Sequence, residues 1–397
     1  MDPTGGAANS TNGLVGDEML QESDVPWLER ALRCAELAIG VSDPNPRVGC
    51  VLTDSAGHFL AEGHTQVAGG PHAEVMALRA AQAVGASVVG GTAYVTLEPC
   101  AHHGRTPPCA DALVAAGLAR VVVALGDPNP LVAGAGASRL RAAGLVVDVL
   151  PGDDPRAVQA RELNIGFLSR MERQRPWVRL KAATSLDGRT ALDNGDSKWI
   201  TGPAARADGH AWRRRASAVL TGIGTVLADD PQLNVRGVQT LRQPVKVVLD
   251  SAWRTPLEAA LWGDGATVWI YGLHGSDAAA SARRDQLRAR GAEVIALPAN
   301  GAGLDLAALM SDLAKRGVNE LHVEAGSRVN ASLIEGGWVD ELLVYLAPKL
   351  LGPGQPMADL QPLGAVSQAQ SWSVRSVSCV GDDVCMILRS LVCGAPD

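Results

Sequence analysis

Four residues in the first third of the chain carry the side chains that a catalytic zinc site requires. His72 and Glu74 are separated by one residue, and Cys100 is followed by a second cysteine, Cys109. One imidazole and two thiolates leave the fourth position of a tetrahedral Zn²⁺ open for water, and the ion lowers the pKa of that water from 15.7 to about 7. The spacing therefore predicts a hydroxide that is available at neutral pH.

Zinc deaminases show this order of residues: a His-x-Glu, then Pro-Cys, then another cysteine. Their glutamate moves protons and does not bind the metal. We therefore expect His72 to bind zinc at the start of a helix and Glu74 to reach the bound water. Zinc deaminases in general place the second cysteine three positions after the first, whereas eight residues lie between Cys100 and Cys109. A closed structural zinc site or a pair of core cysteines is the alternative, but it leaves Glu74 without a role.

The insertion between the two cysteines is itself distinctive. The stretch Thr96–Cys109, with the sequence TLEPCAHHGRTPPC, resembles the deaminase half of the bifunctional riboflavin-biosynthesis deaminase/reductase. The resemblance implies a cytidine-deaminase-like, three-layer α/β/α domain. It also implies that Asn45, in a loop with two prolines, hydrogen-bonds a pyrimidine, and that His103 or Arg105 contacts a phosphate. A capping asparagine in a proline-rich turn is the alternative for Asn45.

The second half of the chain contains a further succession of motifs. They are WVRLKAATSLDGR from Trp177, SKWIT from Ser197, AVLTGIGT from Ala218 and ADDPQLNVR from Ala228. This succession resembles the reductase half of the same bifunctional enzyme, which has a dihydrofolate-reductase-like α/β fold and uses NADPH. The two resemblances cover residues 27–352 and follow one another in the order of that family.

The resemblance implies two sets of contacts in the second half. The substrate contacts are Ser197, Arg213, Leu233, Arg236 and Glu324. The cofactor contacts are Ala183, Trp199, Thr225, Asp229, Ser251, Gly326, Ser327, Arg328, Val329, Asn330, Ala331 and Ser332. A guanidinium can grip two phosphate oxygens at once, which suits Arg213 and Arg236 to a ribosyl phosphate. Surface solvation is the alternative, and the run of three arginines from Arg213 favours it.

A hydroxyl and a cation at the end of a strand would suit the 2′-phosphate of NADPH. Ser251 follows the apolar strand that ends near Asp250, and Arg254 lies three residues further on. The resemblance points to Ser251, and we add Arg254 from its chemistry alone.

Lys181 and Glu324 form the ionisable pair that we expect nearest the reacting ribose carbon. Lys181 lies in an otherwise apolar strand, where burial would depress its pKa. Glu324 precedes Gly326, and a glycine turn into a helix N-terminus presents free N–H groups and the positive end of the helix dipole to a pyrophosphate. An ordinary tight turn is the alternative, here and at Gly222-Ile223-Gly224, because neither stretch carries a full dinucleotide fingerprint.

Strands and helices alternate along both halves, which predicts layered α/β domains. We divide the chain into a disordered tail (1–24), a zinc deaminase domain (25–150), a linker with a charged helix from Ala157 to Met171 (151–175) and a reductase domain (176–395). The stretch Asp127–Gly136 could be taken for a phosphate-binding loop. Its two glycines follow two prolines, however, and the third glycine of the dinucleotide-binding fingerprint is absent, so we expect a structural turn there. We expect buried core thiols at Cys379, Cys385 and Cys393.

The composition narrows the class of protein. The 397 residues carry a net charge of −7, and this acidic balance argues against a nucleic-acid enzyme, which usually presents a basic face. Seven cysteines, an odd number, fit a reducing compartment better than a disulfide framework. We find no signal peptide and no apolar run of about 18 residues. We therefore expect a cytoplasmic homo-oligomer that acts on a small molecule, without nucleic-acid or membrane partners.

These observations lead to one hypothesis, a bifunctional enzyme of riboflavin biosynthesis. Its first domain would hydrolytically deaminate 2,5-diamino-6-ribosylamino-4(3H)-pyrimidinone 5′-phosphate at C2, with Glu74 as the proton shuttle. Its second domain would transfer a hydride from NADPH to C1′, giving 5-amino-6-ribitylamino-uracil 5′-phosphate. Two alternatives are a nucleic-acid editing deaminase, which uses the same zinc chemistry on a flipped base, and a second domain that serves only for dimerisation.

Overall fold

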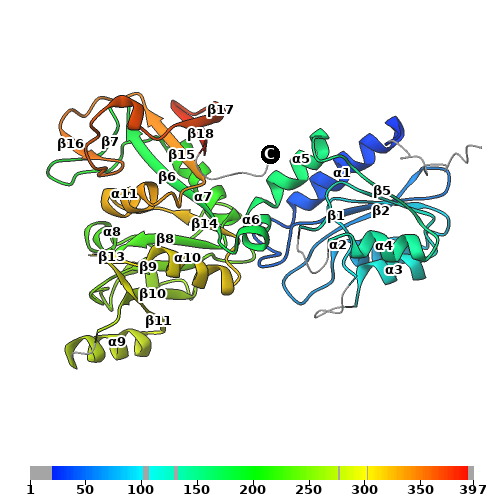
Figure 1. The fold of residues 1–397 in the computed structure, drawn as a ribbon, viewed down its shortest axis with the longest axis horizontal. Helices are drawn as coiled ribbons and strands as arrows, with labels where there is room; N and C mark the ends of the chain where they lie inside the picture. The colour runs from blue at the N-terminus through cyan, green and yellow to red at the C-terminus, as the bar shows by residue number, and fades with distance from the viewer. Residues whose placement is uncertain (1–19, 102–106, 129–132, 276–277, 302, 392–397) are drawn as a thin grey trace, which may run out of the picture.

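Two lobes, each built on its own β-sheet, are joined by the helices α5 (Pro155–Leu163) and α6 (Ile165–Arg173) (Figure 1). The structure is a computed structural model that describes residues 20–101, 107–128, 133–275, 278–301 and 303–391. In the part of the chain that it describes, no helix is both long and apolar enough to cross a membrane.

The first domain contains a five-stranded sheet in the order β2-β1-β3-β4-β5. Its strands are β1 (Gly49–Thr53), β2 (Phe59–His64), β3 (Thr92–Val95), β4 (Arg120–Val123) and β5 (Val146–Val149). Strand β1 is antiparallel to both neighbours, and β3, β4 and β5 are parallel. On one face lie α1 (Val25–Glu36) and α5, and on the other α2 (Ala73–Ala83), α3 (Cys109–Ala115) and α4 (Ala135–Ala142) (Figure 1). This is the predicted three-layer α/β/α arrangement.

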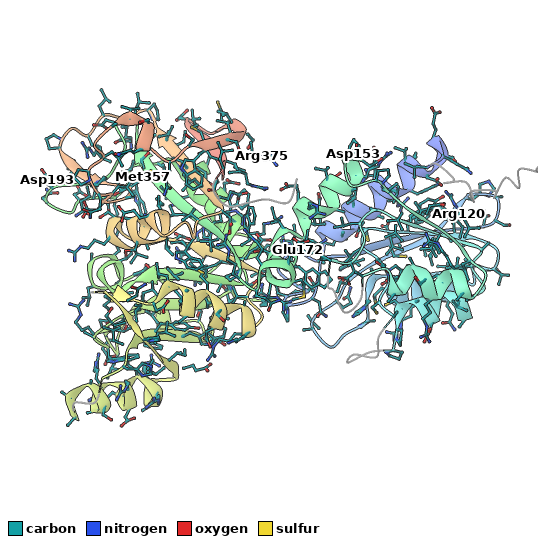
Figure 2. The ribbon with its side chains drawn as sticks, viewed as in Figure 1. Arg120, Asp153, Glu172, Asp193, Met357 and Arg375 are labelled. Carbon is teal, nitrogen blue, oxygen red and sulfur yellow. The ribbon has the colours of Figure 1, made fainter. Side chains whose placement is uncertain are left out.

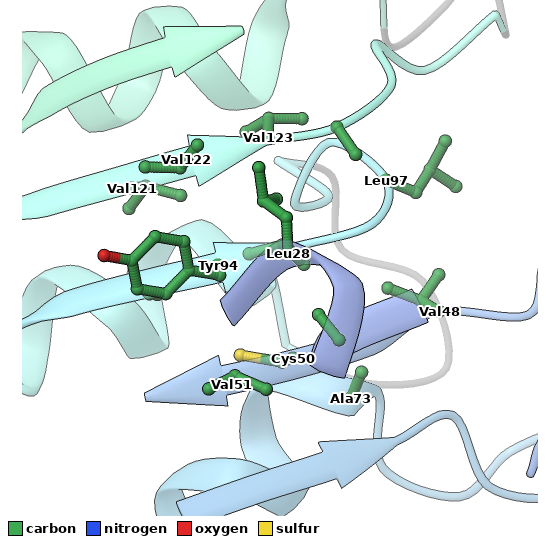
Figure 3. Close-up of a cluster of buried hydrophobic side chains, with 14 of the residues drawn as sticks. Leu28, Val48, Cys50, Val51, Ala73, Tyr94, Leu97, Val121, Val122 and Val123 are labelled. Atoms are coloured by element: carbon green, nitrogen blue, oxygen red, sulfur yellow. The ribbon is translucent and has the colours of Figure 1, made fainter. Parts of the chain in front are cut away.

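Helices cover both faces of this sheet, every residue of β1 is buried, and only the first residues of β3 and β4 are partly exposed. Leu28 of α1 lies over the strands that carry Cys50 and Tyr94 (Figure 3). On the opposite face α2 approaches β2 closely, because a Cβ at Gly63 would lie 2.4 Å from the backbone nitrogen of Ala77. Only glycine allows this approach, which sets the position of the α2 N-terminus against the sheet.

The second domain contains a nine-stranded sheet in the order β11-β10-β9-β8-β14-β6-β15-β18-β17. Its strands are β6 (Trp177–Ser185), β8 (Ala218–Gly222), β9 (Val245–Leu249), β10 (Val268–Leu273), β11 (Ala292–Leu297), β14 (Glu320–Val323), β15 (Glu341–Ala347), β17 (Trp372–Val380) and β18 (Asp383–Ser390). The strands from β11 to β15 in this order run parallel to one another. Strand β18 is antiparallel to both of its neighbours, β15 and β17. Two small ribbons pair β7 (Arg189–Leu192) with β16 (Gly354–Pro356) and β12 (Ala299–Asn300) with β13 (Gly303–Leu304).

Alternate side chains of this sheet pack into different clusters, so both faces are covered. Val247 of β9 packs with α10 (Leu306–Lys315) and α11 (Ser327–Glu335), whereas its neighbour Val248 packs with α8 (Ile223–Asp229) and α9 (Ala278–Arg290). Helix α7 (Pro203–Arg215) covers β15 and β18 through Ala205. Short 3₁₀ turns occur at Glu22–Asp24, Ala260–Trp262 and Val366–Gln368. The mixed α/β class predicted for this half is confirmed.

The predicted disordered tail is wrong at its end, where the chain is held by a buried carboxylate. Asp24 is 1% exposed. It accepts hydrogen bonds from the Tyr94 hydroxyl at 2.9 Å and from Nη1 and Nη2 of Arg120 at 2.7 and 2.9 Å. Figure 2 labels Arg120 within the first lobe. A short polar segment therefore becomes ordered through a distant ion pair, and the remaining tail residues, 1–19, lie outside the described ranges.

The single linker helix predicted from Ala157 to Met171 is also wrong, because two helices meet at Asn164. The Asn164 side chain accepts a hydrogen bond from the Arg47 backbone N–H at 2.7 Å and donates to the Arg47 carbonyl at 2.9 Å. Helix α5 packs against α1 of the first domain, and α6 packs against β6 and β14 of the second domain, so each linker helix is attached to a different domain. Figure 2 shows Glu172 of α6 between the two lobes.

The expectation of buried thiols near the C-terminus holds for one cysteine and fails for another. Cys385 in β18 is 5% exposed, but Cys379 in β17 is exposed. The difference arises because β17 is the last strand of the sheet and most of its side chains face outward. Cys393 lies outside the described residues.

Candidate active sites

Three elements of the first domain bring the predicted zinc ligands together. His72 is the N-cap residue of α2, Cys100 follows β3, and Cys109 is the first residue of α3. Nδ1 of His72 lies 3.2 Å from Sγ of Cys109 and 3.6 Å from Sγ of Cys100. A tetrahedral Zn²⁺ with bonds of about 2.0–2.3 Å needs ligand atoms roughly 3.5 Å apart. One nitrogen and two sulfurs at these separations fit the donor set of a catalytic zinc ion.

The three side chains already polarise one another. Hydrogen bonds from the thiol and backbone N–H of Cys109, together with His72, lower the pKa of Cys100 to about 4 despite its partial burial. The same thiol contact raises the pKa of Cys109, and the hydrogen bond with Cys100 raises the pKa of His72. A thiolate at Cys100 is the form that binds a metal.

Glu74 lies in the first turn of α2, two residues after the imidazole, and is only 3% exposed. Its carboxyl group interacts with the Cys109 thiol, so it faces the cluster, although it is not one of the three grouped donors. Burial raises the pKa of Glu74. A raised pKa makes the carboxylate a stronger base, which suits a group that must accept a proton and return it.

Glu98 is a residue that the sequence reasoning missed, and it holds the loop that carries Cys100. It is 6% exposed. Its carboxylate accepts backbone hydrogen bonds from Asp127 and Gly134 at 3.1 Å and from Ala137 at 3.0 Å. These donors surround the start of α4, so the glycine stretch before that helix has the structural role that we predicted. A carboxylate two residues before a predicted ligand was the available signal.

The predicted pyrimidine contact Asn45 lies in the loop before β1, close to the second domain. Asn45 and Arg47 line a small space there with Phe167 of α6 and Asn319. The backbone N–H of Asn45 donates to the Ser42 carbonyl at 2.9 Å, which closes a tight turn. Its contact with substrate therefore stays a prediction. The predicted phosphate contacts His103 and Arg105 lie outside the described residues.

In the second domain Lys181 lies on β6 and Glu324 directly follows the adjacent parallel strand β14, whose last residue, Val323, pairs with Leu180. Arg213 of α7 grips the Glu324 carboxylate with Nε at 2.5 Å and Nη2 at 2.8 Å. Burial would raise the pKa of Glu324, but Arg213 outweighs it and holds that pKa well below its ordinary value. Burial lowers the pKa of Lys181, partly opposed by Glu324. The predicted ionisable pair is thus a triad with one arginine.

The surface-solvation alternative for the arginine run does not describe these side chains. Arg213 uses three of its five N–H donors on Glu324 and the Asn234 carbonyl, which leaves one each on Nη1 and Nη2 for an anion. Arg214 donates to the carbonyl of Ile39 in the first domain at 3.1 Å. Arg215 donates to Glu320 at 2.8 Å.

The other predicted substrate contacts lie in loops, and the loop of Arg236 contacts α7, because the Arg236 backbone N–H donates to Nδ1 of His210 at 3.2 Å. Arg236 is exposed, and its Nη1 donates to Gln232 at 2.7 Å and to Asn234 at 2.5 Å. Leu233 is 2% exposed, so it can shape a site but offers little contact area. Ser197 is half-buried in the loop after β7. Their roles stay predictions.

The predicted cofactor contacts gather at the carboxyl ends of the parallel strands. Thr225 lies in α8 after β8, Ser251 follows β9, and Gly326 follows β14. A Cβ on Gly326 would lie 3.5 Å from Oγ1 of Thr225, and one on Gly222 would lie 2.8 Å from Cγ2 of Val329. The starts of α8 and α11 are therefore adjacent. Ligands of open α/β sheets bind at this edge.

The remaining cofactor positions differ in exposure. Trp199 is 64% exposed, Ala183 is half-buried on β6, and Asp229 ends α8. Ser327, Arg328, Val329 and Ser332 are at least partly accessible on α11. Asn330 and Ala331 are buried, and Asn330 donates to the Met357 carbonyl at 2.7 Å. These two side chains face the interior, and the cofactor contacts expected from Gly326 to Ser332 stay predictions.

Lys349 is a second residue that the sequence reasoning missed. It follows β15, and its Nζ donates to the carbonyls of Trp199 at 2.9 Å and Ile200 at 2.7 Å. The guanidinium of Arg206 lies 4.6 Å from the Trp199 ring. Lys349 therefore holds the Trp199 backbone, and Arg206 lies over its exposed indole.

Two family models match the chain, one in each half. The zinc-binding region of cytidine and deoxycytidylate deaminases matches residues 21–125, and the RibD C-terminal domain matches residues 176–386. The second match alone spans more than half of the chain. The order of the two models is the order of the two sites described above.

Curated relatives and solved structures match nearly the full length. Riboflavin biosynthesis protein RibD of Escherichia coli (strain K12) is 43% identical over 380 residues, which cover 92% of this chain and 99% of that protein. A structure of Acinetobacter baumannii RibD has a TM-score of 0.83 and 39% identity, and covers 93% of this chain and 99% of its own. A diaminohydroxyphosphoribosylaminopyrimidine deaminase/5-amino-6-(5-phosphoribosylamino)uracil reductase from Thermotoga maritima has a TM-score of 0.80 and 31% identity, with coverages of 93% and 99%. The chain therefore belongs to the RibD family of bifunctional riboflavin biosynthesis proteins.

Proposed function

We propose that this RibD chain performs two successive reactions with the residues assembled in its two domains. The first is hydrolytic deamination of 2,5-diamino-6-ribosylamino-4(3H)-pyrimidinone 5′-phosphate. The second is reduction of the ribosyl group to give 5-amino-6-ribitylamino-uracil 5′-phosphate. The observation that carries the proposal is the cluster of His72, Cys100 and Cys109 beside a buried Glu74, on a chain that matches RibD proteins over both domains.

In the deaminase site His72, Cys100 and Cys109 would hold Zn²⁺. The ion supplies a Lewis acid that lowers the pKa of a water molecule to about 7. The water oxygen adds to C2 of the pyrimidinone, and Glu74 takes its proton. Glu74 passes this proton to the ring nitrogen next to C2, then takes the second proton, from the new hydroxyl group on C2, and passes it to the amino group at C2. The bond from C2 to that nitrogen breaks, and ammonia leaves. Asn45 would orient the ring by hydrogen bonding.

In the reductase site NADPH supplies the hydride that forms the new C1′–H bond. The bond from C1′ to the ring oxygen of the ribose breaks, so that oxygen must receive a proton. Glu324 is a poor donor, because Arg213 keeps its pKa low. Lys181 is the better donor, since burial lowers the pKa of its ammonium group and makes the proton easier to release. Arg213 and Arg236 would bind the phosphate.

Two further properties belong to the proposal. The exposed edge strand β17 carries Val374 and Val377 with exposed fractions of 57% and 59%. Such an edge favours pairing with another chain, which supports a homo-oligomer measurable by sedimentation. Six described cysteines are free thiols, which supports a reducing, cytoplasmic location.

The two-step function is tested with purified, zinc-replete protein and the diaminopyrimidinone ribosyl phosphate. Ammonia release and NADPH oxidation are followed together, and we expect NADPH oxidation to lag behind ammonia release. Ammonia without NADPH oxidation would reduce the second domain to a scaffold. Neither signal would refute the whole proposal.

The role of Glu74 is tested by Glu74→Gln, which keeps the size of the side chain but removes its ability to shuttle a proton. We expect ammonia release to fall by roughly 100-fold or more, with bound zinc unchanged. Normal turnover in this variant would remove Glu74 from the mechanism. Zinc loss would instead show that the carboxylate supports the metal site.

A further inference from the structure

The loop from Ser42 to Arg47 belongs to the deaminase domain, but its side chains are held by the reductase domain. Asp43 has a side chain that is 5% exposed. Its Oδ1 accepts hydrogen bonds from the Ser217 hydroxyl at 2.9 Å and from Nδ2 of Asn319 at 3.0 Å. Its Oδ2 accepts from Nη2 of Arg242 at 2.7 Å. These three partners lie 174 to 276 residues further along the chain.

Arg47 fixes the other end of the same loop. Its Nη1 donates to Oε1 of Glu320 at 2.6 Å, and its Nη2 donates to the Arg215 carbonyl at 2.7 Å. The Arg47 side chain is 5% exposed, so this ion pair with a strand of the reductase sheet is shielded from water. The Arg47 backbone is also held by Oδ1 and Nδ2 of Asn164, the residue between the two linker helices.

Glu320 holds this contact because its carboxylate is charged at neutral pH. Burial would raise the pKa of Glu320, but the guanidinium groups of Arg215, Arg47 and Arg179 outweigh it and hold the pKa well below its ordinary value. Oε2 of Glu320 accepts from Arg179 at 2.7 Å and from Arg215 at 2.8 Å. One carboxylate therefore connects the deaminase loop to two arginines of the second domain.

Asn45 lies midway between the two anchored side chains. The carbonyl of Pro44, its neighbour, accepts from Nη2 of Arg170 at 2.9 Å and from Nδ2 of Asn319 at 3.1 Å. Among the described residues, no side chain forms a hydrogen bond with the side-chain amide of Asn45, so this side-chain amide is available to a ligand. The backbone on both sides of it is fixed by the linker and the reductase domain.

We propose that the reductase domain shapes the substrate loop of the deaminase site, and that Asp43, Arg47 and Arg242 are positioning residues for deamination. The inference rests on the proposed role of Asn45 in binding the pyrimidine. A loop held in the binding conformation does not have to be ordered by the substrate, and that ordering would otherwise weaken binding. Loss of the contact therefore raises the KM for deamination and leaves the metal ligands and Glu74 in place.

The test uses Arg242→Met in the full-length, zinc-loaded protein. Arg242 lies in a loop of the reductase domain, and its side chain is 27% exposed, so the variant removes the charge without opening the core. We expect the KM for ammonia release to rise about tenfold, with kcat within about twofold. Bound zinc, and both kinetic constants for NADPH oxidation with the deaminated intermediate, stay at wild-type values.

Arg316→Met is the matched control, because Arg316 forms a 2.6 Å ion pair with Asp312 in the same domain and its side chain is 24% exposed. This variant keeps the wild-type KM. Asp43→Ala raises the KM as Arg242→Met does, and the double variant is no worse than either single one, since both break one contact. Asp43→Asn, which keeps an acceptor oxygen, restores part of the affinity.

The outcomes separate this inference from the proposed function. If Asn45→Ala leaves the KM unchanged, Asn45 does not bind the pyrimidine and the proposed role fails. If Asn45→Ala raises the KM but Arg242→Met and Asp43→Ala do not, the reductase domain does not shape the loop. Equal losses of deamination and reduction in Arg242→Met would also overturn the inference, since they would mark the pair as a general stabiliser of the fold.

Discussion

Replacement of Glu98 by glutamine tests whether a carboxylate outside the metal site determines how well zinc binds. In the structure Oε2 of Glu98 accepts from the backbone N–H groups of Asp127 and Gly134, and Oε1 accepts from Ala137. These bonds connect the segment after β3, two residues before Cys100, with the start of α4. The variant has nearly the same shape and differs in charge and in one acceptor atom.

The magnitude follows from counting the hydrogen bonds. The glutamine carbonyl can replace Oε2 and keep two bonds, and its amide then faces the N–H of Ala137, a contact between two donors. Loss of one charge-assisted bond together with an unpaired buried N–H costs roughly 2–4 kcal/mol of unfolding free energy. Partners that support a metal ligand from outside the site typically change metal affinity by roughly 10- to 100-fold. We expect zinc affinity to fall within that range.

Two measurements check Glu98→Gln. Competition with a chromophoric chelator gives the zinc dissociation constant, and denaturant unfolding followed by circular dichroism gives the stability. Glu29→Gln, on the exposed surface of α1, is the control and keeps wild-type values. NADPH oxidation with the deaminated intermediate stays normal, because Glu98 lies in the other domain.

Zinc affinity within about twofold of wild type, together with unfolding free energy unchanged to about 0.5 kcal/mol, would refute the reasoning. The Glu98 carboxylate would then be replaceable by a neutral amide. A loss of stability without any loss of zinc affinity would mean that Glu98 supports α4 but not the Cys100 loop.

Three further predictions follow from the two sites and from the N-terminal ion pair. Chelation of zinc abolishes ammonia release but leaves NADPH oxidation with the deaminated intermediate intact, because His72, Cys100 and Cys109 belong to the first domain; parallel loss of both activities contradicts this. Burial lowers the pKa of Lys181 below 10.5, so the rate of reduction falls as the pH rises through that lowered value. Lys181→Arg moves this fall in rate to higher pH, and a pH–rate profile that does not shift excludes Lys181 as the proton donor. Asp24→Asn breaks a buried ion pair and lowers stability by about 3 kcal/mol near neutral pH. Burial would raise the pKa of Asp24, but Arg120 and its other hydrogen bonds lower it, so the stabilisation exists above about pH 4 and is lost as pH falls. The unfolding temperatures of the wild type and of Asp24→Asn should converge at acid pH. A difference that stays constant with pH would mean that the charge of Asp24 does not stabilise the fold.

The sequence alone was sufficient for the parts of the protein that depend on local chemistry. The types and spacing of His72, Glu74, Cys100 and Cys109 predicted a metal cluster, and the structure brings the three donors together. A histidine at a helix start with a glutamate in the first turn is a short-range pattern, so few residues specify it. Alternating strands and helices predicted two layered α/β domains for the same reason.

Tertiary structure alone decided which distant groups support these residues. Glu98 finds its first donor 29 residues away, Asp24 finds Arg120 at a separation of 96, and Asp43 finds Asn319 at 276. Each of these polar residues is unremarkable in its own segment, and each becomes a buried, paired charge only after two elements pack. The last residues of the tail, Glu22–Asp24, were mistaken for disorder and the linker for one helix, because the local composition does not show which distant residues will be their partners. Burial makes an unpaired charge costly, and only the packed chain shows where each partner lies.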